Sequence, residues 1–333
     1  DAVGMTDGLI RMPAESEAQC VTYDTRLRPS GLRGSYSGAF VDSQAPWLWR
    51  PEPMPSQLDA TVRFVLPAGA RVSLPWPYED GVYHPSRSAF FTSSYAVFGS
   101  FEQQTFVHSG VRIDLATLGE RPPIDALRRW ISNAVAVTAS LGGRFPRERL
   151  HAVVAPAQSS EDDVLFGMVR RGGGASVLLI PSMRATSAGL GSDWVAVHEL
   201  SHLWLPRMVA EDRWLSEGIA TYLQEVLRAR CGRQSSERAW SRLRDGFARG
   251  RRSGTGRRLV AESGAMNRTG AYFRVYWAGA AFALETDVRL REESAGKMSL
   301  LRAIDLAHGS WPEARPLRAS VFLEALERAS GSS

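Results

Sequence analysis

Two histidines lie four residues apart in this 333-residue chain, in the segment His198-Glu199-Leu200-Ser201-His202. Residues i and i+4 of an α-helix share one face, so both imidazoles can bind the same metal ion. Glu199 lies about 100° around such a helix from His198, beside the ion but outside its ligand set. The pattern therefore predicts a zinc-binding helix in which Glu199 is the general base that takes a proton from a metal-bound water.

A catalytic zinc ion keeps three protein ligands and one water molecule, so the two histidines need a third partner. Glu217 follows His202 by fifteen residues, in the segment WLSEGIATY from Trp214 to Tyr222. It is either the third ligand or an ordinary acidic residue near the start of a helix. Thr221 stands one helical turn later, and its hydroxyl is either a hydrogen-bond partner of a zinc-bound imidazole or a plain helix residue.

Two antiparallel helices would bring these groups together. Pro206 cannot continue the hydrogen-bond ladder of a helix, so the first helix is expected to end there, with residues 207–213 as the connection. Ser216 can cap the second helix, which is expected to run to about Arg230. Glu217 then falls in the first turn, where the helix dipole favours a negative charge. This arrangement predicts that Glu217 lies over the face that carries the two histidines.

The segments HELSHLW and WLSEGIATY together resemble the gluzincin zinc metallopeptidases, most closely the glycyl aminopeptidase family and more distantly the aminopeptidase N family. The resemblance covers about residues 120–310 and is strongest over residues 193–225 and 272–300. These families usually place their glutamate a few residues further on, so a shorter connection is expected here. The resemblance implies one Zn²⁺ ion as cofactor, three ligands and a general base, namely His198, His202, Glu217 and, as the base, Glu199.

A tyrosine further along the chain also fits this resemblance. The aminopeptidase relatives carry Tyr-x-x-Gly on a helix after the zinc-binding glutamate, and that phenol donates a hydrogen bond to the oxyanion of the tetrahedral state. Tyr276 and Gly279 match the pattern, and Tyr272 lies one turn earlier. A phenol with a pKa near ~10 stays protonated and can stabilise developing negative charge. The alternative is a core tyrosine within an aromatic helix.

The segment that binds the substrate amine in these families differs in this chain. The families place a glutamate after Gly-x-Met or Gly-Leu on a strand before the zinc helix, and it holds the free α-amine. Here the segment reads Gly167-Met168-Val169-Arg170, with Val169 at the position of the glutamate. A cationic Arg170 repels an ammonium group. We expect these four residues and Tyr272 to contact the substrate, with altered recognition of its amino end.

The motifs favour zinc-dependent hydrolysis of peptide bonds on an aminopeptidase-like scaffold, with a peptide or protein as the substrate. Aminopeptidase specificity survives if Glu161, Asp162 or Asp163 supplies the missing negative charge. Otherwise an endopeptidase, or a preference for acidic peptides, is expected. Two further alternatives are a non-catalytic binding protein on a retired protease scaffold and hydrolysis of a non-peptide substrate.

The composition changes near residue 120 and divides the chain into a β-rich N-terminal domain, residues 1–119, and a catalytic domain, residues 120–333. Alternating runs favour strands in the first part, at residues 61–66, 70–74, 89–97, 105–108 and 111–115. The second part predicts helices at residues 124–141, 240–249, 272–291, 299–307 and 317–329, and strands at 150–155 and 176–180. The predicted fold class is α+β: an all-β N-terminal domain followed by a thermolysin-like (gluzincin) catalytic domain with a small mixed sheet and a helical lobe.

The net charge is +5, and arginine supplies nearly all of the positive charge. Residues 249–252 and 257–258 form an arginine-rich segment that is either a solvated loop or a patch for polyanions. The sequence holds no nucleic-acid-binding motif and no apolar run long enough to span a membrane. Cys20 and Cys231 either pair or stay free. The chain begins with Asp1 rather than Met, which weakly favours a periplasmic or secreted protein over a cytoplasmic one. The sequence gives no oligomeric state.

Overall fold

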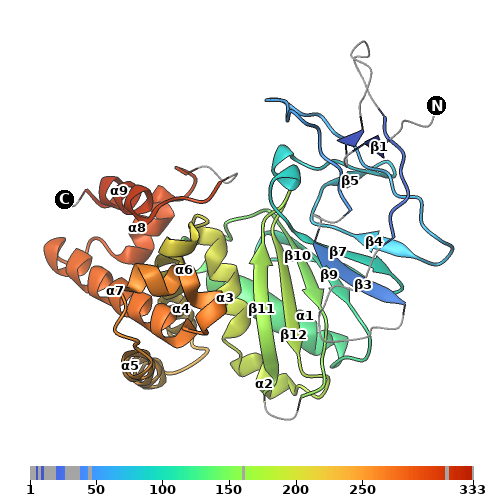
Figure 1. The fold of residues 1–333 in the computed structure, drawn as a ribbon. Helices are drawn as coiled ribbons and strands as arrows, with labels where there is room; N and C mark the ends of the chain where they lie inside the picture. The colour runs from blue at the N-terminus through green and yellow to red at the C-terminus, as the bar shows by residue number, and fades with distance from the viewer. Residues whose placement is uncertain are drawn as a thin grey trace.

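The computed structural model describes residues 20–26, 38–43, 47–159, 162–311 and 315–331, together with the backbone of two short paired strands, β1 (Met5–Thr6) and β2 (Leu9–Ile10). A helical lobe and an N-terminal β layer lie on either side of a central sheet (Figure 1). No helix among the described residues has both the length and the apolar character needed to cross a membrane.

The central sheet has five strands in the order β11-β12-β10-β9-β8. They are β8 (Glu102–His108), β9 (Val111–Thr117), β10 (Arg149–Val154), β11 (Val164–Arg170) and β12 (Ser176–Pro181). The three inner strands are parallel, whereas β8 and β11 run antiparallel to their neighbours at the two edges. β11 is therefore an edge strand, and its outer edge lies beside α3 (Val195–Ser201).

Both faces of the three inner strands of this sheet are buried. One face packs against α1 (Ile124–Ala139) in a core that includes Ile113, Leu150, Val177, Leu127 and Ile131. The other face packs against the N-terminal layer in a second core that includes Ala116, Val153, Leu178, Val41, Tyr95 and Val97. Burial on both sides explains why β10 and β12 are continuous apolar runs in the sequence instead of alternating ones.

The N-terminal layer consists of a three-stranded sheet in the order β3-β7-β4, a two-stranded hairpin of β5 and β6, and a 3₁₀ turn, η1. These elements are β3 (Ala39–Ser43), β4 (Arg71–Ser73), β5 (Tyr78–Glu79), β6 (Val82–Tyr83), η1 (Arg87–Phe90) and β7 (Tyr95–Gly99). Its core is a cluster of aromatic rings whose centroids lie 5.3–6.3 Å apart, made of Trp47, Phe64, Trp76, Tyr83 and Phe98.

The helical lobe follows β12. Its α-helices are α2 (Ser187–Ser192), α3, α4 (Arg213–Arg230), α5 (Ser236–Arg252), α6 (Leu259–Thr269), α7 (Tyr272–Glu293), α8 (Leu300–Ala307) and α9 (Ala319–Ser330). Two 3₁₀ turns, η2 (His202–Trp204) and η3 (Ala210–Asp212), lie between α3 and α4. The helix that carries the two histidines therefore ends before Pro206, as predicted.

Two glycines let α4 and α7 approach each other closely. A Cβ atom on Gly218 would lie 2.2 Å from the carbonyl carbon of Gly279, and one on Gly279 would lie 2.0 Å from the carbonyl oxygen of Trp214. Neither backbone atom can move aside as a flexible side chain could, so glycine is required on both helices. This contact sets Tyr276, one turn before Gly279, beside Glu217 on the facing helix.

The α+β fold class is confirmed, as are the hairpin of β8 and β9 and most of the predicted helices. The strand predicted at residues 61–66 is wrong, because only Val62 pairs, with Tyr83, and Val65 is 93% exposed. Apolar and polar residues alternate there because every second side chain packs against the aromatic cluster, although the backbone has no continuous partner strand. The strand predicted at residues 89–97 starts only at Tyr95, since Ala89 lies in the η1 turn.

Two other expectations change. The solvated loop that was one alternative for the arginine-rich segment is wrong for residues 249–252, which form the last turn of α5, where basic side chains complement the helix dipole, whereas residues 257–258 lie in the connection between α5 and α6. The sequence analysis also missed α6 (Leu259–Thr269) and α2 (Ser187–Ser192). The division of the chain at residue 119 stays a prediction. The strands β8 and β9, which precede this residue, belong to the same sheet as β10–β12, which follow it.

Candidate metal centre

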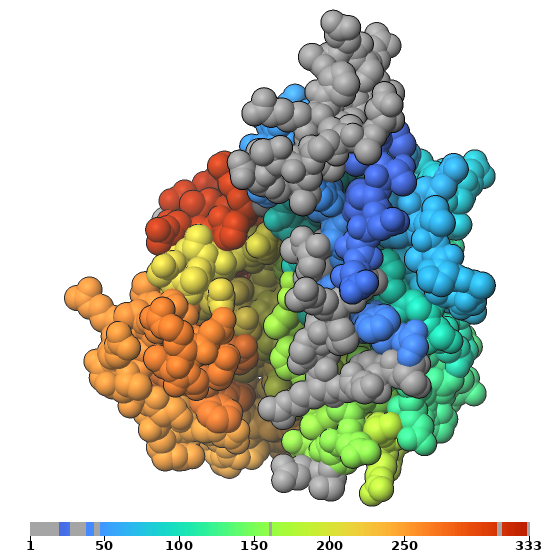
Figure 2. All heavy atoms as spheres, turned by 45° about the vertical axis from the view of Figure 1, so that its right-hand side comes forward, coloured from blue at the N-terminus to red at the C-terminus, as the bar shows by residue number. Residues whose placement is uncertain are grey.

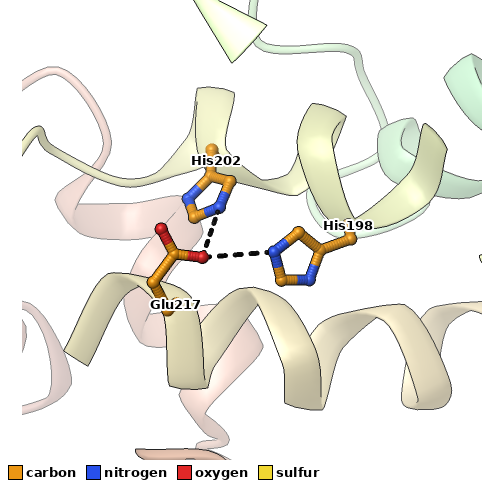
Figure 3. A group of neighbouring side chains, drawn as sticks. All are labelled: His198, His202 and Glu217. Atoms are coloured by element: carbon orange, nitrogen blue, oxygen red, sulfur yellow. Dashed lines mark hydrogen bonds and ion pairs between the residues drawn. The ribbon is translucent and has the colours of Figure 1, made fainter. Parts of the chain in front are cut away.

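Three side chains from neighbouring elements converge on one point (Figure 3). His198 lies on α3, His202 begins the η2 turn that follows it, and Glu217 lies on α4. The Nε2 atoms of both histidines lie 3.3 Å from the same Oε2 atom of Glu217. Metal-ligating atoms of the three residues all lie within 4.8 Å of one another. The structure thus brings together the three residues that the sequence predicted as ligands.

The helix that carries Glu217 starts earlier than predicted. α4 begins at Arg213, so Ser216 is inside the helix and does not cap it, and its hydroxyl donates to the carbonyl of Arg213 at 3.2 Å. Ser263 of α6 accepts a hydrogen bond from the amide of Trp214 at 3.1 Å and so satisfies a donor of the first turn. Glu217 is therefore in the second turn of α4, where the neighbouring histidines stabilise its charge more directly than the helix dipole does.

The donor set and its spacing fit a zinc ion. A tetrahedral ion with bonds of about 2.0–2.1 Å sets its ligand atoms about 3.3 Å apart, which is the spacing found between Glu217 and each imidazole. Two imidazole nitrogens and one carboxylate oxygen are also a donor set that zinc accepts in catalytic sites. Burial raises the pKa of Glu217, but the charges and hydrogen bonds of His202 and His198 outweigh it and hold that pKa well below its ordinary range. Glu217 is therefore an anion at neutral pH.

A buried amide orients the first histidine. Nδ1 of His198 lies 2.8 Å from Oε1 of Gln224, and Gln224 is only 4% exposed. An amide oxygen accepts hydrogen bonds, so it holds a proton on Nδ1 and leaves Nε2, 3.3 Å from Glu217, as the atom that can bind a metal ion. Thr221, the partner expected from the sequence, does not serve this purpose, because its hydroxyl donates to the carbonyl of Glu217 at 2.8 Å.

The orientation of this amide is itself fixed. Nε2 of Gln224 donates to Oε1 of Glu225 at 3.0 Å, and Glu225 is 1% exposed. Gln234 donates to the other carboxylate oxygen at 2.8 Å, and the guanidinium groups of Arg228 and Arg242 lie 3.7 and 3.9 Å from Glu225. Sequence analysis missed this network, although Gln224 lies two helical turns after Glu217 and therefore on the same face of α4.

We expect Gln224→Leu to raise the dissociation constant for zinc by about 10–100-fold, as is typical when a partner of a metal-bound histidine is removed. Competition with a chromophoric chelator measures this constant. Thr221→Val is the matched control on the same helix, because it removes a hydroxyl that bonds only the backbone. Equal zinc affinity in wild type and Gln224→Leu, or an equal loss in both variants, would contradict this role of Gln224.

The helix of the two histidines is capped by an aspartate that the sequence analysis did not single out. Asp193 accepts hydrogen bonds from the amides of Val195 and Ala196, each at 2.9 Å. The indole of Trp130 on α1 donates to the same carboxylate at 2.9 Å. The cap ties the start of α3 to the core of the domain. An aspartate just before an apolar helical run was the available signal.

The side chain of Glu199 extends from α3 towards the edge strand β11. Its Oε2 accepts a hydrogen bond from the amide of Val169 at 2.9 Å. A Cβ atom on Gly167 would lie 2.7 Å from Val195 and 2.8 Å from Glu199, so this glycine lets β11 approach the helix. Burial raises the pKa of Glu199, and the nearby charges of His198 and His202 oppose part of that rise. A raised pKa brings a carboxylate closer to the range that suits a general base.

Tyr276 lies over the other side of the centre. Its ring stacks on His198, with centroids 5.8 Å apart and planes 10° from parallel, and its phenol hydrogen-bonds to Glu217. Burial and the carboxylates of Glu217 and Glu199 raise the pKa of Tyr276, so the phenol is neutral and can donate. Tyr272 contacts it edge to face at 6.3 Å and is 43% exposed at the start of α7.

The predicted substrate segment lies on β11 along this centre. Met168 is 39% exposed, whereas Val169 turns its amide to Glu199. Arg170 is held away from the histidines, because it hydrogen-bonds to Ser93 and its guanidinium lies 5.1 Å from the ring centroid of Tyr95 in the N-terminal layer. Figure 2 shows the surface hollowed between the orange helices and the green part of the sheet.

Of the three acidic residues considered as replacements for the glutamate, the two that the structure describes, Asp162 and Asp163, lie away from the centre. Asp163 accepts a hydrogen bond from the amide of Thr186 at 2.8 Å and lies six residues before Val169. At about 3.3 Å per residue of strand, six residues span about 20 Å. Asp162 precedes it and is exposed, and Glu161 lies outside the described residues.

No family model matches the sequence, and no curated protein sequence matches it. Solved structures do match. An aminopeptidase N family protein from Idiomarina loihiensis has 18% identity and a TM-score of 0.56, over 71% of this chain and 46% of that one. An M1 zinc metallopeptidase from Deinococcus radiodurans has 20% identity and a TM-score of 0.51, over 81% and 60%. A mutant of the latter was crystallised with the substrate Tyr-Ser-Ala.

Yeast LTA4 hydrolase is similar at 13% identity and a TM-score of 0.53, over 80% of this chain and 42% of that one. The chain thus spans between about two fifths and three fifths of the length of these proteins. At such identities the likeness concerns the fold. The chain shares the fold of these aminopeptidase N family and M1 zinc metallopeptidase structures.

Proposed function

We propose that this protein is a zinc-dependent peptidase. The observation that carries the proposal is the meeting of two imidazole nitrogens and one carboxylate oxygen at 3.3 Å, with a second carboxylate, Glu199, on the same helix as His198. The fold of M1 zinc metallopeptidases supports it, since one of these binds the peptide Tyr-Ser-Ala. The finer resemblance to the glycyl aminopeptidase family stays a prediction.

The residues of the centre have different roles in the proposed hydrolysis. His198, His202 and Glu217 would hold a zinc ion, which would supply an acidified water and a Lewis acid for the scissile carbonyl. Glu199 takes up the proton released during attack and returns it to the leaving amine, which a carboxylate with a raised pKa can do at neutral pH. The phenol of Tyr276 donates a hydrogen bond to the carbonyl oxygen as negative charge develops there.

The edge strand provides a place for the substrate backbone. Successive residues of a strand direct their backbone groups to opposite sides, and the amide of Val169 points away from β12 towards Glu199. The backbone groups of Gly167, two residues earlier, therefore also face the free edge. An extended peptide can pair with this edge by strand addition, which places its scissile bond beside Glu199.

One observation favours cleavage inside peptides over removal of the first residue. Binding of a free α-amine calls for a carboxylate on β11, and the side chain there is Val169. Among the described residues, the carboxylates whose charges act on Tyr276 are Glu217 and Glu199, which already have roles as ligand and base. We therefore infer that an unblocked amino terminus adds nothing to recognition and that the enzyme acts as an endopeptidase.

The test is a digest of a peptide library, followed by one cleaved peptide in free and N-acetylated forms. We expect zinc-dependent cleavage at internal bonds and similar kcat/KM for the two forms. Cleavage of the free form alone would remove the endopeptidase assignment and leave the peptidase. Stoichiometric zinc without any cleavage would contradict the peptidase and favour a binding protein.

We expect Tyr276→Phe to lower kcat for peptide hydrolysis by about 10²-fold with little change in KM, as for loss of one oxyanion donor. The substitution keeps the ring that stacks on His198 and removes only the phenol oxygen. Tyr78→Phe is the control, because it removes the same phenol oxygen from an exposed ring of β5 in the N-terminal layer. Full kcat in Tyr276→Phe would restrict Tyr276 to a packing role.

A further inference from the structure

A second cavity, of about 370 Å³, lies between the N-terminal layer and the β8–β10 end of the central sheet. Its lining residues come from β4, β6, β8, β9 and β10 and the segments around them, and none of them belongs to the metal centre. The sheet order places β8, β9 and β10 on the far side of β12 from the edge strand β11. The cavity is therefore separate from the proposed peptidase site.

A buried carboxylate shared by two arginines forms the floor of this cavity. Asp114 is 6% exposed and accepts a hydrogen bond from Thr105 at 2.7 Å. Its Oδ2 lies 3.1 Å from Arg149 and its Oδ1 lies 3.4 Å from Arg112. Both oxygens are thus engaged, while each guanidinium has five N–H donors and uses few of them here. Arg112 remains 53% exposed and Arg149 34% exposed, so the unused donors face the cavity or solvent.

Among the described residues that line the cavity, positive charges outnumber negative ones. Three arginines, Arg71, Arg112 and Arg149, line it, and among the described lining residues the only carboxylate is Asp114. Arg71 has no carboxylate within 4.0 Å in the described part of the chain, and its guanidinium lies 6.0 Å from the ring of Phe101. His151, next to Asp114 across the strands, adds no charge, because burial lowers its pKa to about 4. Within the described lining, three arginines and one aspartate leave an excess of two positive charges, which suits the cavity to an anion.

The opposite wall of the cavity is aromatic. Phe64, Trp76, Tyr78 and Tyr83 line it, and the rings of Tyr78 and Tyr83 lie 4.7 Å apart. The phenol of Tyr83 donates to the carbonyl of Val72 at 3.1 Å, and burial raises its pKa to about 12, so this wall carries no negative charge. A volume of 370 Å³ lies at the lower end of the range of small-molecule sites, about 300–1,000 Å³.

We propose that this cavity binds a small aromatic carboxylate. The carboxylate pairs with the free donors of Arg112 and Arg149, since a planar guanidinium matches both oxygens of a carboxylate. The ring lies against Tyr78 and Tyr83, where aromatic contacts add to the burial of apolar surface. An anion without an apolar body would leave the aromatic wall in water, and a neutral aromatic would leave the excess charge unpaired.

Isothermal titration calorimetry of the full chain with 3-phenylpropionate tests the proposal, with 3-phenylpropanamide and inorganic phosphate as companion probes. We expect saturable 1:1 binding of the carboxylate below about 1 mM, and at least about tenfold weaker binding of the amide and of phosphate. No heat from the carboxylate up to about 10 mM would overturn the proposal. Equal binding of the amide or of phosphate would overturn the ligand class.

The matched variants are Arg112→Gln and Arg63→Gln, which remove the same charge. Arg112 lines the cavity and is half exposed, whereas Arg63 is exposed and lies next to Phe64 without lining the cavity. We expect Arg112→Gln to weaken the carboxylate at least about tenfold and Arg63→Gln to leave it unchanged, with equal melting temperatures without ligand. Equal loss in both variants would contradict the site. The proposal uses no zinc and no peptide cleavage, so its outcome is independent of the proposed peptidase function.

Discussion

Glu199→Gln is expected to lower kcat/KM for peptide hydrolysis by about 10⁴-fold while the protein keeps its zinc ion. General acid–base catalysis contributes about 10²–10⁴-fold, and the upper end applies because the same carboxylate accepts and returns the proton. The amide is nearly isosteric, and its oxygen can still accept the hydrogen bond from Val169. The ligand set, His198, His202 and Glu217, is untouched. Peptide kinetics and atomic spectroscopy of the dialysed protein measure the two quantities.

Glu324→Gln on α9 is the control for this substitution. Glu324 is 61% exposed and lies 3.8 Å from Arg328, an exposed pair of the kind that contributes little to stability. The control should keep wild-type activity and zinc content. If Glu199→Gln retained activity within about tenfold of wild type, the proton would have to move through another group. Loss of zinc from that variant would instead make Glu199 part of the ligand set.

The sequence predicted which three side chains come together because the main signal is local. The i, i+4 spacing of His198 and His202 fixes both rings on one helical face whatever surrounds the helix. Glu217 was expected beside the histidines from its context, and the structure places it there, but the local reason given for its position was partly wrong. Its helix starts before Ser216, because the hydroxyl of Ser263 on α6 accepts a hydrogen bond from the amide of Trp214. A local sequence pattern cannot predict a hydrogen-bond acceptor that comes from a helix far along the chain.

Features that depend on distant contacts were not predictable. Arg170 was expected to face the substrate, yet Ser93 and Tyr95 hold it, and these residues lie more than seventy positions earlier in the chain. The role of Gln224 was predictable only in part. Its place on the face of Glu217 follows from helical spacing, but its contact with His198 depends on how α3 crosses α4. Thr221, one turn from Glu217, was the more obvious candidate and bonds only to the backbone.

The glycines show the same division between local and distant causes. Gly279 entered the sequence analysis only through the Tyr-x-x-Gly pattern, and the structure shows why a glycine is needed there, since a Cβ atom would lie 2.0 Å from the carbonyl oxygen of Trp214. Gly167 is needed for a different neighbour, Glu199, because the strand must come close enough for the amide of Val169 to reach it. Both contacts position catalytic candidates, and a helical or strand pattern alone identifies neither.

Glu217→Gln is expected to raise the dissociation constant for zinc by at least about 10³-fold and to abolish activity at stoichiometric zinc. The carboxylate supplies the one anionic ligand, and a neutral amide oxygen is a much poorer partner for zinc. In this structure the same oxygen lies 3.3 Å from both imidazoles, so the amide keeps the shape of the site and loses its charge. Glu285→Gln, exposed on α7, is the control that removes the same charge elsewhere.

The pH dependence of zinc binding separates a loss of charge from a loss of structure. Burial lowers the pKa of His198. Its hydrogen bond with Glu217 and the charges of Glu199 and Glu217 raise that pKa by more than burial lowers it, so the net shift is upward. A histidine must lose its proton to bind zinc, so in wild type binding weakens as the pH falls through this raised pKa. Glu217→Gln removes part of the upward shift. Its zinc affinity should therefore be weaker at every pH but begin to fall only at a lower pH than in wild type, as titrations with a zinc indicator between about pH 5 and 8 measure. An unchanged midpoint together with unchanged affinity would show that Glu217 contacts neither the ion nor the histidines in solution.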